Sequence, residues 1–194
     1  KEPVSIRQRD FRFRPDFGRF EVTTGFSQFG LAFDVWGNRF LSWNTVHIRH
    51  AGLEQQYLDR NPYMPPAGAV REIAEHGSTC RVFPASRTTP RFNAEPPGYM
   101  NASCGLTIYR GDALPAAYRG NAFVCEPLSN LVHRDVLEPA GTTFVARRHE
   151  SESAAEFLTS TDPWFRPVNL TTGPDGCLYV IDFYRASVEH PQFV

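Results

Sequence analysis

The sequence predicts a mainly β protein with many short strands, long irregular loops and one or two short helices. The chain of 194 residues contains 16 Phe, 7 Tyr and 3 Trp, which are residue types that favour strands. It also contains 16 Pro and 14 Gly, which divide a chain into short elements joined by turns. A chain of this length can bury about 70% of its unfolded surface. We therefore expect a single domain over residues 1–194.

Three stretches share one plan: an apolar strand, a turn rich in Gly and Asp, and a second aromatic strand. They are GLAFDVWGNRFLSWN (30–44), GLTIYRGDALPAAYRGNAFVCEP (105–127) and NLTTGPDGCLYVID (169–182). A repeated multi-stranded unit that cannot bury both faces alone is typical of a propeller or solenoid. Strands that are apolar on both faces favour stacking between neighbouring blades. The prediction is a partial β-propeller of about three blades, with repeat-like units near 26–82, 104–148 and 164–185.

Short helices are predicted at 53–61 and 151–159, because Pro62 and Pro163 follow closely as stop signals. Both are interpreted as connectors between strands. The stretch from 83 to 103 is rich in proline and has little periodicity. It is expected to be a long loop at one end of the disc.

Charge and hydropathy exclude several classes of partner. The net charge is -1, so no general attraction to nucleic acid or to an anionic membrane is expected. No run of 18 apolar residues occurs, and a transmembrane segment is not predicted. The amino terminus KEPVSIRQRD lacks the apolar core of a signal peptide.

Long strings of residues resemble a known family. These strings are GFSQFGLAFDVWGNRFLSWNTVHIRH, YLDRNPY, CGLTIYRGDALPAAYRGNAFVCEPLSNLVHRDVLEP and EFLTSTDPWFRPVNLTTGPDGCLYVIDFYRASVEHPQF. Over nearly the whole chain they are similar to the membrane-bound dehydrogenase family common in planctomycetes. That family is related to the glucose/sorbosone dehydrogenases, which are six-bladed β-propellers that can use pyrroloquinoline quinone. The chain resembles the later half of such a propeller.

The resemblance implies a function. It points to a segment of a periplasmic or otherwise extracytoplasmic, membrane-associated, sugar or alcohol dehydrogenase-like protein. Pyrroloquinoline quinone and calcium would be its cofactors, and electrons would pass to a c-type cytochrome. The missing earlier blades, or a partner protein, would cover the open edges. Because the general-base histidine of the quinoprotein relatives lies in the earlier half, this chain alone is not expected to catalyse.

A second hypothesis comes from what the sequence lacks. Lys1 is the only lysine, so the lysine of such cofactor sites has no counterpart here. No paired catalytic carboxylates and no nucleophile–base motif are recognisable. The alternative is a non-catalytic accessory or binding propeller that docks onto a larger membrane or electron-transfer assembly.

Polar residues at strand ends are the candidates for cofactor or substrate binding, and no catalytic residue is assigned. The candidates are Gln28, Asn44, His47, Arg49, Asn130, His133, Arg134, Arg166, Asp182, Tyr184 and Arg185. The guanidinium of Arg166 suits a carboxylate of a cofactor or a sugar acid. In a competing interpretation, Asp182, Tyr184 and Arg185 close a turn and pair with one another at the surface.

Histidines and cysteines give further predictions. His47 and His50 would fall on opposite faces of a strand, so no metal site is expected from this pair. No CxxCH motif occurs, and covalent haem is not predicted. Cys104 and Cys125 would lie opposite each other on antiparallel strands, where a disulfide is feasible and would favour an oxidising compartment. Cys80 and Cys177 are expected to be buried free thiols.

Overall fold

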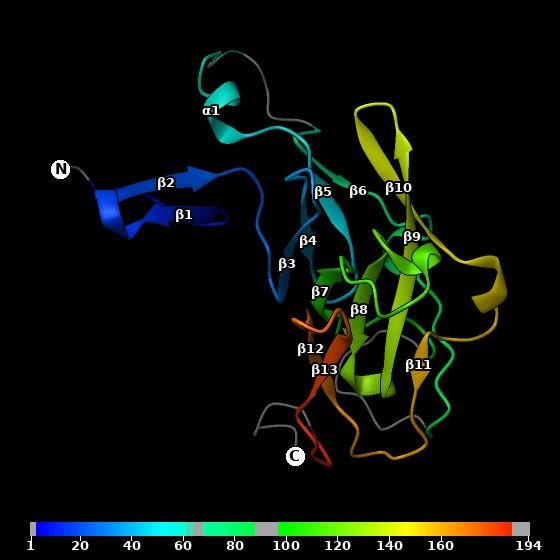
Figure 1. Cartoon of the computed structure of the whole chain (residues 1–194). Coiled ribbons are helices and arrows are strands. Elements are labelled where there is room, and N and C mark those ends of the chain that lie inside the picture. The colour runs from blue at the N-terminus through cyan, green and yellow to red at the C-terminus, as the bar shows by residue number, and fades with distance from the viewer. Residues whose placement is uncertain (1–2, 62, 64–67, 88–96, 188–194) are drawn as a thin grey trace.

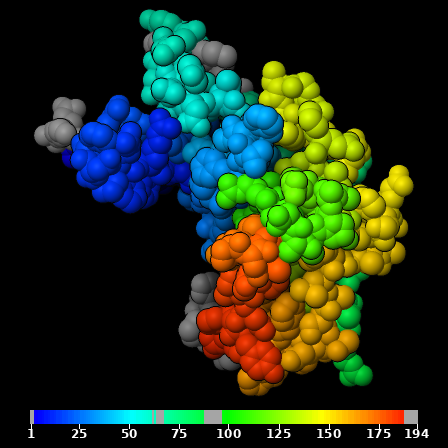
Figure 2. All heavy atoms as spheres, in the orientation of Figure 1, coloured from blue at the N-terminus to red at the C-terminus, as the bar shows by residue number. Residues whose placement is uncertain are grey.

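The computed structural model describes residues 3–61, 63, 68–87 and 97–187. Strands dominate these residues and form four antiparallel sheets (Figure 1). The first is a hairpin of β1 (Asp10–Arg14) and β2 (Arg19–Thr23), joined by the 3₁₀ helix η1 (Pro15–Phe17). This hairpin stands out from the rest of the molecule (Figures 1 and 2, dark blue).

The first blade is a four-stranded sheet in which neighbours in sequence are neighbours in space. Its strands are β3 (Gly30–Phe33), β4 (Arg39–Ser42), β5 (Arg49–Ala51) and β6 (Val70–Glu72). The β3–β4 turn is held by the Asp34 carboxylate, which accepts hydrogen bonds from the backbone N–H groups of Trp36 and Asn38. The helix α1 (Gln55–Leu58) lies between β5 and β6. The 3₁₀ helix η2 (Gly77–Thr79) follows β6.

The second blade repeats this order and is larger. Its strands are β7 (Cys104–Ile108), β8 (Ala122–Glu126), β9 (Leu131–Ala140) and β10 (Thr143–Arg148), and the short β11 (Leu158–Thr159) also pairs with β9. Three 3₁₀ helices connect them: η3 (Ala116–Tyr118), η4 (Pro127–Ser129) and η5 (Glu150–Glu152). The third blade is the hairpin of β12 (Pro167–Thr172) and β13 (Leu178–Asp182).

The first strands of the three blades lie side by side. The N–H of Gly105 on β7 donates to the carbonyl of Phe29, which precedes β3, over 3.0 Å. The hydroxyl of Thr107 on β7 donates to the carbonyl of Leu170 on β12, also over 3.0 Å. Inner strands that follow one another around an axis are typical of propeller blades. The predicted mainly β, partial-propeller fold is therefore confirmed.

Glycine permits this close approach at Gly105. Its φ is +60°, and a Cβ there would lie 2.6 Å from the Asn169 Cα of the third blade. Any side chain would therefore push the second and third blades apart, in a backbone conformation that other residues rarely adopt.

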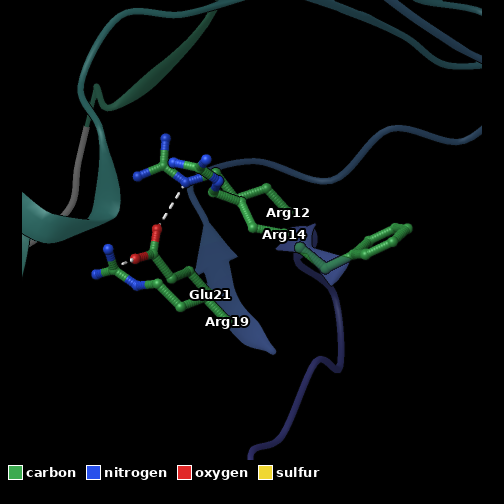
Figure 3. A pocket seen from close by; sticks show the side chains of 5 residues that line it. Arg12, Arg14, Arg19 and Glu21 are labelled. Atoms are coloured by element: carbon green, nitrogen blue, oxygen red, sulfur yellow. Dashed lines mark hydrogen bonds and ion pairs between the residues drawn. The ribbon is translucent and has the colours of Figure 1, made fainter. Parts of the chain in front are cut away.

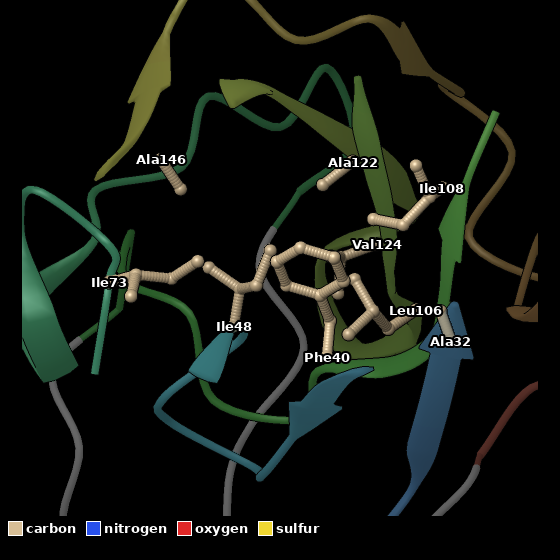
Figure 4. Close-up of a cluster of buried hydrophobic side chains, with 9 residues drawn as sticks. All are labelled: Ala32, Phe40, Ile48, Ile73, Leu106, Ile108, Ala122, Val124 and Ala146. Carbon is tan, nitrogen blue, oxygen red and sulfur yellow. The ribbon is translucent and has the colours of Figure 1, made fainter. Parts of the chain in front are cut away.

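The apolar cores lie between the blades. Phe40 and Ile48 of the first blade pack with Leu106 and Val124 of the second (Figure 4). A second cluster joins the second and third blades, and includes Tyr109, Phe123, Val132 and Leu170. The second blade therefore buries apolar side chains against both of its neighbours, and the first and third blades each bury one face against it.

The outer faces of the first and third blades stay apolar and exposed. On the β3 side, Phe29, Leu31 and Phe33 are 53%, 43% and 47% exposed, whereas Ala32 between them is buried. On β13 and just after it, Tyr179, Ile181 and Phe183 are 50%, 43% and 55% exposed. The third blade lies at the surface in Figure 2 (orange to red). On β3 the period of two shows that one face of the strand is uncovered. On β13 exposure is more general, because Asp182 and Tyr184 are exposed as well.

The helix predictions hold only in part. The helix α1 covers four residues of the predicted 53–61. The predicted helix at 151–159 is wrong, because this stretch contains η5, an irregular turn and β11. Leu158 and Thr159 are extended because they pair with Val132 and Leu131 of β9. No described helix has the length and apolar character needed to cross a membrane.

Candidate site: a buried histidine–carboxylate cluster

Two of the predicted site residues, His47 and His133, meet in the interior between the first and second blades. They belong to a group that we call the histidine–carboxylate cluster, whose members are His47, His133, Asp135, Arg148 and Glu156. His47 and His133 are each 1% exposed and Asp135 is 3% exposed. The cluster is therefore shielded from water. Charged groups interact more strongly in such an interior than they do in water.

Strand geometry places these side chains together. His47 lies in the segment between β4 and β5, and His133 and Asp135 are two residues apart on β9. Residues i and i+2 of a strand share a face, so His133 and Asp135 both point toward His47. Arg148 ends β10, and Glu156 lies just before β11.

The contacts form a chain. The Asp135 carboxylate bridges the two imidazoles, with Oδ2 2.7 Å from His47 Nε2 and Oδ1 3.1 Å from His133 Nε2. His133 Nδ1 lies 2.9 Å from Glu156 Oε2. Glu156 Oε1 accepts from the Arg148 guanidinium at 3.1 Å and from the Phe83 N–H at 3.0 Å.

Burial and neighbouring charges act in opposite directions on these groups. Burial lowers the pKa of His47 despite its contact with Asp135. Burial would also lower the pKa of His133, but Asp135, Cys80 and Glu156 raise it well above its usual range. Burial would raise the pKa of Asp135, yet the two histidines hold it well below its usual range. Two buried carboxylates are thus balanced by His133 and Arg148, each carrying a positive charge.

Cys80 adjoins the cluster. Its Sγ is 4.0 Å from His133 Nε2, and the side chain is 0% exposed. The ligand-type atoms of His47, Cys80 and His133 all lie within 4.8 Å of one another. The sequence predicts no metal site from His47 and His50, which it places on opposite faces of a strand. The structure places His47 beside His133 and Cys80. His50 instead packs against Phe40 and Phe144.

The sequence did not single out Asp135, Glu156, Arg148 or Cys80 as partners of the histidines. The alternation His133-Arg134-Asp135 on a strand is the one local signal for Asp135. Glu156 and Cys80 come from irregular segments, where spacing carries no information about contacts.

The other buried candidates are occupied by structural contacts. Arg166, 1% exposed, donates to the backbone carbonyls of Pro127, Arg185 and Ala186. Arg134 forms an ion pair with Glu152 at 2.7 Å and stacks on the Tyr118 ring.

Asn130 is also fully buried, and its φ of 56° is left-handed. Its amide donates to the carbonyls of Pro163 and Phe165 and accepts from the Ser86 hydroxyl. It therefore ties η4 to the segment that leads into the third blade.

The remaining candidates lie nearer the surface. Arg49 pairs with Glu72 at 2.9 Å and stacks on Trp43. The Gln28 side-chain oxygen accepts from the Asn44 N–H at 3.3 Å. These contacts hold the first blade together.

The group at the end of β13 closes a turn. The Asp182 carboxylate accepts from the N–H groups of Arg166 and Tyr184, at 2.8 and 2.9 Å. The Arg185 N–H donates to the carbonyl of Trp164, and the rings of Trp164 and Tyr184 are 5.7 Å apart. The geometry fits the turn-closing interpretation of these residues.

These placements do not fit a quinone cofactor with calcium. The arginines that would hold its carboxylates are engaged with backbone carbonyls, Glu152 or Glu72. The candidate residues do not converge on one of the described hollows.

The described surface hollows lie elsewhere. One of about 300 Å³ lies on the β1–β2 hairpin and is lined by Arg12, Phe13, Arg14, Arg19 and Glu21 (Figure 3). Glu21 pairs with Arg12 at 2.7 Å and with Arg19 at 3.1 Å. A smaller hollow, of about 150 Å³, lies where His50 and Thr143 meet between the first two blades.

The cysteine predictions need correction. Cys104 and Cys125 lie opposite each other in register, as predicted, but both are free thiols. Burial raises the pKa of Cys104 to about 12 and also raises the pKa of Cys125. Because disulfide formation needs a thiolate, these thiols are poorly reactive. Cys80 is buried, whereas Cys177 is exposed, contrary to expectation.

Comparisons with known proteins place the chain in one family. A family model described as "Domain of unknown function (DUF7133)" matches residues 1–194. A search of curated proteins finds no match. A solved structure described as "Crystal structure of glucose dehydrogenase" is similar at 17% identity and a TM-score of 0.35, over 88% of this chain and 68% of that chain. The resemblance to membrane-bound dehydrogenases of the planctomycete type stays a prediction.

Proposed function

The chain belongs to the DUF7133 family, and from that premise we propose that it is a scaffold segment of a larger, dehydrogenase-like β-propeller. The observation that carries this proposal is the pair of uncovered apolar faces. Leu31 on β3 and Ile181 on β13 mark these faces, at opposite ends of the stack of blades. In a propeller every blade is covered on both faces, so further blades or a partner would cover them.

The finer part of the proposal rests on the sequence. The long strings around β3–β5, β7–β9 and β12–β13 resemble membrane-bound dehydrogenases. The proposed parent is therefore a periplasmic or otherwise extracytoplasmic, membrane-associated sugar or alcohol dehydrogenase, with a c-type cytochrome as electron acceptor. The reacting groups and any quinone would be held outside this chain.

A second candidate is favoured by a specific observation. Arg134, Asn130 and Arg166 are all used to hold the blades and loops together. A propeller whose polar residues serve its own fold suits an accessory subunit that docks through its apolar faces and performs no chemistry.

An activity assay separates the two candidates. The protein is purified with its native assembly, supplied with pyrroloquinoline quinone and calcium, and tested for dye reduction with a panel of sugars and alcohols. Turnover by the intact assembly supports the dehydrogenase. Loss of turnover when this chain is assayed alone supports the scaffold role. No turnover in the intact assembly, together with a stable co-purifying partner, supports the accessory subunit.

A further inference from the structure

We propose that His47, Cys80 and His133 bind one divalent transition-metal ion of the zinc class, which locks the first blade to the second. The three residues come from the segment before β5, from the end of η2 and from β9. Their exposed fractions are 1%, 0% and 1%, and their ligand-type atoms lie within 4.8 Å of one another. The inference is independent of the proposed dehydrogenase role.

The donor set matches the chemistry of zinc. Imidazole nitrogen and thiolate sulfur are preferred ligands of this ion, in tetrahedral geometry. Metal–ligand bonds of about 2.0–2.3 Å place tetrahedral ligand atoms about 3.3–3.8 Å apart. The 4.0 Å between Cys80 Sγ and His133 Nε2 is close to that range. A small inward movement of the side chains would complete the site.

Asp135 can supply the fourth ligand. Its two carboxylate oxygens already lie 2.7 Å from His47 Nε2 and 3.1 Å from His133 Nε2. The resulting set of two imidazoles, one thiolate and one carboxylate is complete for a tetrahedral ion.

The surroundings of His133 are those of a metal ligand. Its Nδ1 faces the Glu156 carboxylate at 2.9 Å, which leaves Nε2 directed toward Asp135 and Cys80. Glu156 is in turn fixed by Arg148 and by the Phe83 N–H. A carboxylate behind a histidine commonly orients that histidine toward a metal.

In the proposed site His47 binds the ion through Nε2, the nitrogen that lies 2.7 Å from Asp135 Oδ2. The other ring nitrogen, Nδ1, is buried and has no hydrogen-bond partner among the described residues.

Binding of the ion would release protons to solvent, because imidazole and thiolate bind a metal only in their deprotonated forms.

The site is closed. None of the described surface hollows is lined by His47, Cys80 or His133. Closed sites with four protein ligands are structural, so the ion would join the blades rather than activate a substrate.

Metal analysis and cobalt substitution test the proposal. Elemental analysis of the full chain, purified without chelator, should find one zinc per chain. After chelation and dialysis, Co²⁺ should bind with a thiolate-to-cobalt charge-transfer band. Cys80→Ser should abolish this band, whereas Cys177→Ser, a control at an exposed thiol, should retain it. Glu156→Gln should weaken zinc binding about 10- to 100-fold.

A folding defect in Cys80→Ser would not obscure the result. In the chelated wild-type chain, zinc should raise the thermal midpoint. In mild denaturant, where local opening lets reagent reach the buried Cys80 thiol, zinc should slow alkylation of Cys80 but not of Cys177. The proposal is overturned if the wild-type chain takes up no stoichiometric zinc or cobalt. It is equally overturned if cobalt binds without a thiolate band, or if zinc leaves the alkylation of Cys80 unchanged.

Discussion

His47 of the first blade and Asp135 of the second blade are 2.7 Å apart, in a contact that is buried on both sides. This contact and the apolar cluster around Phe40 hold the two blades together by different means. The apolar cluster supplies most of the driving force, because burial of apolar surface is the dominant favourable contribution. The polar contact is costly to break on one side, because Asp135 would lose one of the two histidine partners that compensate for its burial.

Asp135→Asn should destabilise the chain by about 3–5 kcal/mol, because it leaves the positive charge of His133 with one carboxylate in place of two. Chemical denaturation measures the loss. Glu138→Gln on the same strand is the control, since its ion pair with Arg147 is largely exposed and should contribute less than about 1 kcal/mol. Equal losses in the two variants would contradict the importance of the buried contact.

Phe40→Ala should cost about 3–5 kcal/mol, because it opens a cavity between the first and second blades. Phe40 is 0% exposed and packs against Phe144. Trp36→Ala, at a residue that is 87% exposed, should change stability by about 0.5 kcal/mol or less. Thermal or urea unfolding distinguishes them. A small effect at Phe40 would show that the blades do not pack as described.

Gly105→Ala should be more damaging than Gly37→Ala. Both glycines have positive φ, but only at Gly105 would the new Cβ clash, at 2.6 Å from the Asn169 Cα. Gly37 has no atom within 4 Å of that position, so its variant reports backbone strain alone. The difference in unfolding free energy measures the contact between β7 and β12. Equal losses would mean that these strands are not in contact.

Thiol labelling should find one reactive cysteine in the native chain. Cys177 is exposed, although hydrogen bonding to Asp175 raises its pKa. The buried Cys80 and Cys125 should label only after unfolding. Cys104 is half-buried and should label slowly in the native chain, because burial raises its pKa to about 12. Mass spectrometry of alkylated, non-reduced digests identifies which cysteines are labelled. A Cys104–Cys125 linkage in these digests would contradict the free thiols of the structure.

The sequence predicts the strand pairs well because their signals are local. Asp34 follows β3, and its carboxylate accepts a hydrogen bond from the Trp36 N–H in the turn. Gly176 takes a φ of +77° in the turn between β12 and β13. The stretch 151–159 could not be predicted from local signals. Its composition favours a helix, but Leu158 pairs with Val132 of β9 and is therefore extended.

The site could be predicted only in part. The sequence predicts His47 and His133 as candidates because they are polar residues at predicted strand ends. Cys80 and Glu156 reach the same spot from irregular segments, through contacts that span 53 and 23 residues from His133. Such contacts depend on how the loops pack, which no spacing rule encodes. Arg166 was a ligand candidate, yet its guanidinium serves backbone carbonyls.

The most direct test of the proposed scaffold role is maleimide labelling of Leu31→Cys and Ile181→Cys in a Cys177→Ser background. Glu138→Cys, at an exposed position on β9, is the control. In the isolated chain all three should label. In the native assembly, positions 31 and 181 should be protected and position 138 should remain reactive. Equal labelling of all three positions in the native assembly would contradict the proposal that further blades or a partner cover these faces.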